Sequence, residues 1–368
     1  MDNKLNVLFI CPTVASYIGG TETVVIQLSQ RLKGKVRLTL LSGDAGHGRK
    51  ELIDTGGFEL LTIPFIGRDS RLNHVLSKIL MSSPFKIESY SFFRAMRRVG
   101  LDISKYDYIL TFYEADAYLL SKQYPLIRAK FRHFLPGVSI RGFFRPVPAT
   151  NVFFFGYRAA EKTKRKWGID IQSMPLGVDS DFFPLAPPRY PEMKRLLYLG
   201  RLNGSKHVDW LADFFVESGL AHKGYQLDIV GEGPLLQSLL AKHENAEGII
   251  FHGRKRQEEV IEFLRHAFLL LHPTNHESFG LTILEAMAAG VPVITHELDS
   301  IKIWAKDYPR YAPYLDSAAW TREILKFEQP SYWADVSSAS MEHAKSFTWD
   351  RVSEQVLGLL TTSEQKMP

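Results

Sequence analysis

The chain has 368 residues, more than a single hydrophobic core usually serves, so its length predicts two domains. Apolar residues make up 45% and charged residues 23%, a globular balance, and no stretch has the roughly 20 consecutive apolar residues of a membrane-spanning helix. The single cysteine, Cys11, excludes an intramolecular disulfide, and with no apolar signal segment at the start we expect a cytoplasmic protein.

The net charge of +5 is unevenly distributed. Residues 68–145 contain 14 lysines and arginines but only 6 acidic residues, so the remaining chain is slightly acidic. A basic segment of this kind is compatible with an anionic membrane, an anionic substrate or an ordinary solvated surface.

The first half of the chain alternates between strand and helix patterns. Apolar runs that predict strands occupy 5–11, 35–43, 106–113, 131–135 and 151–157. Segment 19–32, GGTETVVIQLSQRL, has apolar residues at helical spacing, and a basic helix is expected after Tyr157. A strand, a glycine-containing turn, a helix and a second strand form the βαβ pattern of a parallel sheet.

The second half repeats this alternation. Strands are expected in 194–202, 225–234, 248–254, 268–274 and 291–296, and helices in 208–219, 235–243 and 257–267. The predicted fold class is therefore α/β, with two doubly wound, Rossmann-like parallel-sheet domains.

The domain boundary is expected in the proline-containing stretch MPLGVDSDFFPLAPP, residues 174–188. We place the first domain at 1–172 and the second at 173–345. Residues 346–368 comprise a final helix, expected to pack back on the first domain, and a polar tail.

The turns that follow the strands are where ligands bind in an open parallel sheet. In the second half these turns read GRLNGSK (200–206), GEGP (231–234), GRK (253–255) and NHESFG (275–280). Glycine lets backbone approach a ligand closely. Two cations, Arg201 and Lys206, next to backbone N–H groups suit a diphosphate.

The segment HESFGLTILEAMAAG, residues 276–290, contains two acids eight positions apart. If a helix begins near Phe279 and Gly280, its first N–H groups form an anion site. Carboxylates repel a phosphate, so Glu277 and Glu285 are expected to accept hydrogen bonds from sugar hydroxyls on either side of it. In isolation the same spacing also fits a capping carboxylate and a solvent-facing glutamate.

In combination these segments resemble the retaining GT-B glycosyltransferases of family 4, the glycosyl transferases group 1. The resemblance depends on six motifs: GGTE (19–22), PLGVD (175–179), YLGRL with Lys206 (198–206), IVGEGP (229–234), FHGR (251–254) and HPTNHESFGLTILEAMAAGVPVI (272–294). It spans nearly the whole chain. It implies the GT-B fold, in which two Rossmann-like domains face each other across a cleft.

The resemblance also implies roles for individual residues. Arg201, Lys206 and Glu277 become the catalytic candidates, with the two cations on the diphosphate and Glu277 on the transferred sugar. Glu285 is expected to hold the ribose. The other nucleotide-sugar-binding candidates are Gly19, Gly20, Gly200, Gly231, Glu232, Arg254, Ser278, Phe279, Gly280 and Leu281. No metal or other cofactor is expected, because cationic side chains take the metal's place.

The chain departs from the family pattern at two places. Family members usually place a histidine at the end of a first-domain strand, where this chain has Pro136, with His133 three residues earlier. Tyr113, Glu114 and His133 are therefore the candidate acceptor-side groups. After VPVI the chain reads THELDSIKIW (295–304) instead of a glycine pair and a glutamate.

The function implied by the resemblance is a metal-independent hexosyltransferase. Its donor would be a UDP- or GDP-sugar, and its acceptor a glycan or lipid-linked molecule of bacterial cell-surface polysaccharide or lipopolysaccharide synthesis. The alternatives are an epimerase-like enzyme of the same fold and a catalytically silent nucleotide-sugar-binding subunit. No motif indicates nucleic-acid binding.

The basic segment adds one expectation. YSFFRAMRRVG, residues 90–100, alternates Phe92, Phe93 and Met96 with three arginines, which fits peripheral docking on the inner face of the membrane. The alternative is an ordinary amphipathic helix with its aromatic side packed inward.

Overall fold

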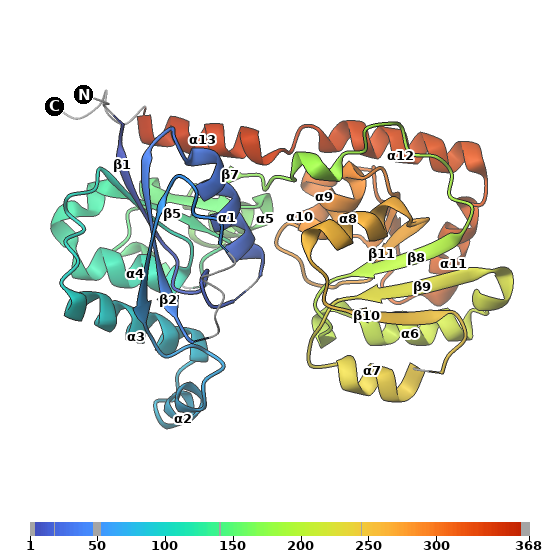
Figure 1. Ribbon diagram of the computed structural model, residues 1–368, viewed down its shortest axis with the longest axis horizontal. Coiled ribbons are helices and arrows are strands. Elements are labelled where there is room, and N and C mark those ends of the chain that lie inside the picture. Colours follow the sequence, from blue (N-terminus) through green and yellow to red (C-terminus); the bar gives the residue numbers. More distant parts are fainter. Residues whose placement is uncertain (1–3, 18, 47–52, 140, 244, 362–368) are drawn as a thin grey trace. The chain divides into compact units, whose positions relative to one another are not determined.

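The computed structural model describes residues 4–17, 19–46, 53–139, 141–243 and 245–361. The chain divides into two compact units. The first comprises Met1–Leu176 and Trp349–Pro368, and the second comprises Gly177–Thr348. Each unit contains one parallel sheet with helices packed against it (Figure 1).

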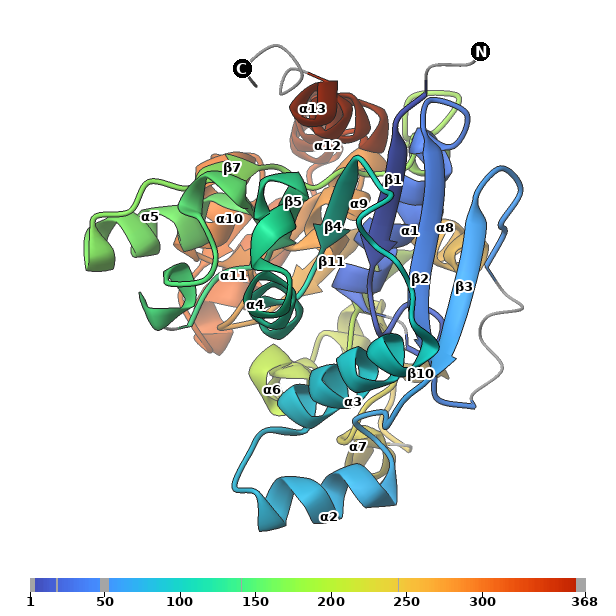
Figure 2. The same cartoon turned by 90° about the vertical axis from the view of Figure 1, so that its left-hand side faces the viewer.

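The sheet of the first unit has seven strands in the order β3-β2-β1-β4-β5-β6-β7. They are β1 (Asn6–Ile10), β2 (Arg37–Asp44), β3 (Glu59–Pro64), β4 (Tyr108–Thr111), β5 (Phe131–Leu135), β6 (Val152–Phe155) and β7 (Gln172–Met174). Figure 2 shows β3, β2, β1 and β4 side by side. The strand order reverses between β1 and β4, and such a switch point places a ligand crevice at the carboxyl ends of these two strands.

Helices complete the first unit. They are α1 (Gly20–Leu32), α2 (Arg71–Ile79), α3 (Pro84–Val99), α4 (Glu114–Gln123), α5 (Tyr157–Trp167) and α13 (Trp349–Thr361). Helices α3 and α4 bury their apolar sides against strand residues that include Leu8, Ile10 and Ile109. Because β1 is buried along nearly its whole length, both faces of the sheet are covered, as a parallel sheet requires.

The last helix, α13, packs against α1 within the first unit. Its Val352, Val356 and Leu360 are buried, and Asp350 Oδ1 lies 3.0 Å from Arg31 Nε. The polar tail expected after this helix, 362–368, lies outside the described residues.

The structure corrects the membrane expectation for residues 90–100. Phe92, Phe93 and Met96 are at most 1% exposed, because they form the apolar side of α3 that packs on the sheet. The aromatic side chains therefore do not alternate with the arginines at the surface, and the ordinary amphipathic helix is the correct interpretation.

Helix α2 instead exposes its apolar side chains. Leu72, Val75 and Ile79 are all more than half exposed, and Leu80 and Met81 follow at 59% and 95%. The helix packs against α3 and projects from the rest of the unit in both views (Figures 1 and 2). Its start is fixed locally, since the Ser70 side chain accepts a hydrogen bond from the Asn73 backbone N–H.

The second unit has a six-stranded sheet in the order β10-β9-β8-β11-β12-β13. Its strands are β8 (Lys194–Leu199), β9 (Tyr225–Val230), β10 (Ile249–Gly253), β11 (Leu269–His272), β12 (Val293–His296) and β13 (Arg310–Ala312). The switch point lies between β8 and β11, which pair in parallel through Leu196 and Leu269. The expectation of two doubly wound parallel sheets is confirmed.

Seven α-helices occur in the described part of this unit. They are α6 (Val208–Glu217), α7 (Leu236–His243), α8 (Gln257–Arg265), α9 (Leu281–Ala288), α10 (Asp299–Ala305), α11 (Ser317–Lys326) and α12 (Pro330–Ala344). The core combines strand residues with large aromatics from the helices, such as Phe214, Trp320 and Trp333.

Strand β13 and helices α10, α11 and α12 add to the elements expected from sequence, as do β3, β7, α2 and α4. The two sheet-edge strands β7 and β13 have three residues each, too short for an apolar period. None of the helices in the described residues has both the length and the apolar character needed to cross a bilayer.

Candidate functional site

The switch point of the second sheet brings together two turns that the sequence predicts as ligand-binding. One follows β8 and contains Arg201 and Lys206; the other follows β11 and contains Glu277. Direct hydrogen bonds join the turns, because Thr274 Oγ1 donates to the Ser205 carbonyl at 3.1 Å. These turns lie at the carboxyl ends of adjacent strands, where open parallel sheets bind ligands.

Lys206 and Glu277 form an ion pair across these two turns. Both side chains are largely buried, and His272 Nε2 lies 3.2 Å from the same carboxylate oxygen, Glu277 Oε1. Burial alone would raise the pKa of Glu277, but the hydrogen bond and charge of His272 and the Lys206 ammonium lower it to about 2. Glu277 is therefore a fixed anion that holds Lys206 in place.

His272 is a member of this group that the sequence pattern did not single out. It ends β11 and is 2% exposed, and its Nδ1 has no hydrogen-bond partner within the described residues. Its position directly after a buried apolar strand was the available signal, since a polar residue there lies at the ligand edge of the sheet.

Arg201 is exposed and directly follows Gly200, the first residue after β8. Its carbonyl accepts a hydrogen bond of 3.1 Å from Tyr198 Oη, which fixes the turn while the guanidinium remains at the surface. The structure therefore places a paired, largely buried cation, Lys206, and an exposed cation, Arg201, on one turn.

Gly231, in the turn after β9, is required by packing between two turns as well as by the expected approach of backbone to a ligand. At Gly231 (φ 147°) an added Cβ would lie 1.9 Å from the Gly200 carbonyl oxygen. The close approach is thus between the turns after β8 and β9, whose tight packing only glycine permits. The neighbouring Glu232 and, after β10, Arg254 are exposed, so both are available to a ligand at this edge.

Helix α9 begins as expected, with Gly280 as its N-cap at φ 90°. This left-handed conformation favours glycine. Phe279 is 2% exposed and stacks on Trp304 with ring centroids 4.6 Å apart, while its carbonyl accepts a hydrogen bond from Trp304 Nε1. Ser278 is exposed and Leu281 half-buried, so a rigid backbone presents the first amides of the helix.

Glu285 lies in the second turn of α9 and keeps a small part of its surface in contact with solvent. Burial raises its pKa to about 7. A carboxylate held away from water in this way accepts hydrogen bonds strongly, and a ligand hydroxyl would relieve part of its desolvation.

The second unit thus combines a buried ammonium, an exposed guanidinium, the amides of a helix N-terminus and two carboxylates. Groups of the first three kinds can bind an anion, and carboxylates can accept hydrogen bonds from hydroxyl groups. A phosphate linked to sugars on both sides matches this arrangement.

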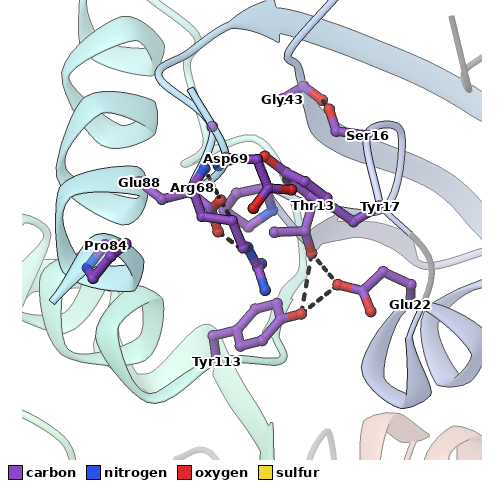
Figure 3. A network of polar contacts seen from close by, with 12 residues as sticks. Thr13, Ser16, Tyr17, Glu22, Gly43, Arg68, Asp69, Pro84, Glu88 and Tyr113 are labelled. Atoms are coloured by element: carbon purple, nitrogen blue, oxygen red, sulfur yellow. Dashed lines mark hydrogen bonds and ion pairs between the residues drawn. The ribbon is translucent and has the colours of Figure 1, made fainter. Parts of the chain in front are cut away.

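The first unit has its own polar network at the carboxyl ends of β1 and β4 (Figure 3). Glu22 is 5% exposed and accepts a hydrogen bond of 2.5 Å from Thr13 Oγ1 and another from Tyr113 Oη. Burial, together with the Glu22 charge, raises the pKa of Tyr113. Within GGTE, the sequence analysis singled out the two glycines, whereas the glutamate is the residue that organises this site.

Gly19 and Gly20 lie at the start of α1, beside this network. A Cβ at Gly19 would come within 2.7 Å of Glu22 Oε2, so the glycine also leaves room for the buried carboxylate. That Gly19 and Gly20 approach the diphosphate of a bound donor remains a prediction.

Of the three acceptor-side candidates, Tyr113 and Glu114 lie with this network at the carboxyl end of β4. Tyr113 caps α4, and Glu114 Oε1 accepts hydrogen bonds from the Ser139 backbone N–H at 3.0 Å and from its hydroxyl at 2.9 Å. His133 does not fit the role. It is 0% exposed within β5, and its ring nitrogens pair with Thr111 and Ser121 hydroxyls at 2.8 and 3.2 Å.

Burial, followed by the nearby Arg132 charge, lowers the pKa of His133 to about 3, so the ring is neutral. We assign it to packing and hydrogen bonding inside the sheet. A cavity of the first unit lies away from these groups, at the amino ends of β1, β2 and β3, where Asn6, Arg37 and Glu59 line it.

Comparison with known proteins shows what the second unit is similar to. Residues 181–329 match the family model described as glycosyl transferases group 1. The D-inositol 3-phosphate glycosyltransferase of Acidothermus cellulolyticus is 28% identical over 178 residues, covering 45% of this chain. The match spans only 40% of that relative's own length.

Two further similarities cover nearly the whole chain. The phosphatidyl-myo-inositol mannosyltransferase of Mycobacterium tuberculosis is 24% identical over 379 residues, 96% of each chain. The crystal structure of Anabaena Alr3699/HepE in complex with UDP-glucose superposes with a TM-score of 0.71 at 14% identity, over 97% of this chain and 100% of that one. The sequence resemblance is confirmed, and the two sheets have the GT-B fold.

Proposed function

We propose that this chain, whose residues 181–329 match the glycosyl transferases group 1, transfers a sugar from a UDP- or GDP-sugar to a glycan or lipid-linked acceptor. The observation that carries the proposal is the Lys206–Glu277 pair at the switch point of the second sheet. It joins a cation for the diphosphate to a carboxylate for the sugar, next to the N-terminus of α9.

The chemistry follows from where charge develops. Breaking the bond between the anomeric carbon and the diphosphate leaves additional negative charge on the departing oxygen. Lys206, Arg201 and the first amides of α9 supply positive charge and hydrogen bonds to that oxygen as the bond breaks, which is electrostatic stabilisation of the transition state. Because these groups come from the protein, we propose that the reaction needs no metal ion.

The carboxylates orient the two sugars of the donor. Glu277, anionic at every physiological pH, accepts hydrogen bonds from hydroxyls of the transferred sugar, and Glu285 accepts them from the ribose. Gly19 and Gly20 of the first unit are proposed to approach the diphosphate during the reaction. We propose retention of the anomeric configuration, as in the family that the motifs resemble.

The acceptor is proposed to be part of a bacterial cell-surface polysaccharide, made at the inner face of the membrane. The exposed apolar side chains of α2, and of Leu80 and Met81 after it, support this location. The cations Arg71, Lys78 and Lys86 are exposed on or close to the same helix, and their charge complements an anionic lipid surface.

The test is a titration of UDP, GDP and their hexose conjugates with the full chain, followed by product analysis with the donor that binds. We expect one base to be preferred. Substituting Lys206→Ala should lower turnover about 10²-fold or more, the size of effect seen for a lost charge stabiliser. Glu217→Gln, an exposed change on α6, serves as the control.

A full-rate Lys206→Ala enzyme would contradict the diphosphate assignment. Interconversion of sugar nucleotides without any acceptor would instead indicate an epimerase-like enzyme. Tight donor binding with no product from any acceptor would indicate a silent binding subunit.

A further inference from the structure

Side chains from three loops of the second sheet meet at the two turns that contain Lys206 and Glu277. His207 directly follows Lys206 in the turn after β8, and Asn275 lies two residues before Glu277 in the turn after β11. The third side chain, Tyr314, lies two residues after the end of β13. All three loops leave the carboxyl ends of parallel strands, so they share the ligand-binding edge of the sheet.

The Tyr314 hydroxyl joins the other two loops. Its oxygen lies 2.6 Å from His207 Nε2 and accepts a hydrogen bond of 3.1 Å from Asn275 Nδ2. The rings of Tyr314 and His207 also meet edge to face, with centroids 5.1 Å apart. One phenol group therefore links the residue next to Lys206 with a residue two positions from Glu277.

The ring of Tyr314 is also held by packing. His296, the last residue of β12, lies against it with ring centroids 5.1 Å apart and planes tilted by 51°. His296 belongs to residues 295–304, where the chain departs from the family pattern. Contacts from three neighbouring loops thus orient Tyr314 although it is 39% exposed.

The backbone on both sides of the contact between Tyr314 and His207 is in the left-handed region. His207 has φ 50° and ψ 35°, and Leu315, directly after Tyr314, has φ 52°. Among the described residues, only Met81 and Lys306 share a positive φ without being glycine. A side chain raises the conformational energy of left-handed backbone, and such a conformation persists only where surrounding contacts enforce it, often at functional sites.

The conformation of His207 determines how Lys206 is presented. Lys206 ends a short 3₁₀ turn, Gly204–Lys206, and α6 begins at Val208, so His207 alone connects the two. If His207 relaxed to the right-handed region, the turn would rotate relative to α6. The Lys206 ammonium would then leave its position against Glu277.

We propose that His207 and Tyr314 are positioning residues for Lys206, because their contact maintains the left-handed residue that aims the ammonium at the donor. The inference rests on the function proposed above and adds two residues outside the six sequence motifs. Glu277 is assigned to the transferred sugar, which is attached to the outer phosphate of the donor. Since Lys206 is paired with Glu277, it is expected to bind that outer phosphate.

The test compares nucleotides with and without the outer phosphate. The full chain is titrated with UDP and UMP, and with GDP and GMP, by isothermal titration calorimetry. Tyr314→Phe removes the hydroxyl and keeps the ring. In this variant we expect diphosphate affinity to fall at least fivefold and kcat at least tenfold, while the affinity for the monophosphate of the same nucleoside stays unchanged.

A double-mutant cycle shows whether the effect passes through Lys206. Lys206→Ala alone should weaken diphosphate binding. Adding Tyr314→Phe to that variant should change the affinity less than twofold, because no ammonium is left to position. If Tyr314 only stabilised the fold, it would lower the affinity equally in both backgrounds.

Conservative substitution of His207 provides a rescue. His207→Ala should reproduce the loss of diphosphate affinity. His207→Asn should keep at least half of the affinity, because asparagine tolerates the left-handed conformation and its amide can hydrogen-bond the Tyr314 hydroxyl.

Tyr311→Phe is the matched control. It removes a hydroxyl on β13 that donates to the Lys306 carbonyl at 2.6 Å, away from the contact with His207. This variant should bind both nucleotides as the unmodified protein does.

Unchanged diphosphate affinity in Tyr314→Phe would overturn the proposal, as would an equal loss in the Lys206→Ala background. In both cases the unmodified protein still binds the diphosphate, so the proposed function stands. If neither UDP nor GDP binds the unmodified protein, the proposed function itself fails.

Discussion

Glu285 shows how a single residue relates function to stability. Its pKa is raised from 4.5 to about 7 by burial, so the folded protein keeps a proton between these pH values that the unfolded chain releases. The native state therefore loses stability as the pH rises from about 4.5 to 7. At about 1.4 kcal/mol per pH unit, the loss is on the order of 2–3 kcal/mol.

We predict that Glu285→Gln removes this loss. The variant should gain melting temperature relative to the unmodified protein at pH 8 but not at pH 5, because the amide never becomes charged. Differential scanning calorimetry at both pH values measures the effect, with the exposed Glu217→Gln as control. The assignment fails if Glu285→Gln and the unmodified protein show the same pH dependence.

At the same scale, motif reasoning located the charged residues of the second unit but not their partners. Arg201, Lys206 and Glu277 follow from position at strand ends, whereas the ion pair and the contribution of His272 require two turns about 70 positions apart to meet. Glu22 and the Arg68–Glu88 pair were not predicted for the same reason, since each depends on residues from separate elements.

Among the elements, α9 and α2 show opposite outcomes. The start of α9 could be located because glycine, an apolar helical period and a preceding strand coincide there. Helix α2 has no comparable signal, because its exposed apolar residues resemble a buried face. For α3, the sequence could not decide whether the aromatic side packs inward or faces a membrane, because that depends on the sheet against which the helix packs.

We predict that α2 contacts anionic membranes. The triple variant Leu72→Ser, Val75→Ser, Ile79→Ser should bind vesicles containing phosphatidylglycerol at least tenfold more weakly, because burial of each apolar side chain contributes roughly 1 kcal/mol or more. Sedimentation with vesicles measures the effect, and binding should fall with added salt.

The control for this experiment is Val216→Ser, an exposed apolar residue of α6 in the second unit. Equal sedimentation of the triple variant and the unmodified protein would exclude α2 as the contact. If the unmodified protein bound vesicles of phosphatidylcholine alone as well as vesicles containing phosphatidylglycerol, an electrostatic contribution would be excluded.

For the whole molecule, the assignment of the C-terminal helix to the first unit has a measurable consequence. Val356 on α13 is 0% exposed where this helix packs against α1. We predict that Val356→Asp destabilises the first unit by several kcal/mol, because a buried charge without a partner is introduced. Hydrogen exchange should accelerate within residues 4–176 and much less within 177–348.

Gln355→Asp, one position away and exposed, is the matched control and should leave exchange in both units nearly unchanged. If exchange in Val356→Asp became faster only within the second unit, α13 would stabilise that unit, and its assignment to the first unit would be wrong.

The sequence by itself determined the class of this protein. The repeated strand–helix period predicts two parallel sheets, and the polar residues at strand ends predict where the ligand groups lie, because both depend on local order along the chain. The tertiary structure alone decided which charges meet and which aromatic side chains are buried. Those features depend on distances between residues far apart in the sequence, which no local pattern encodes.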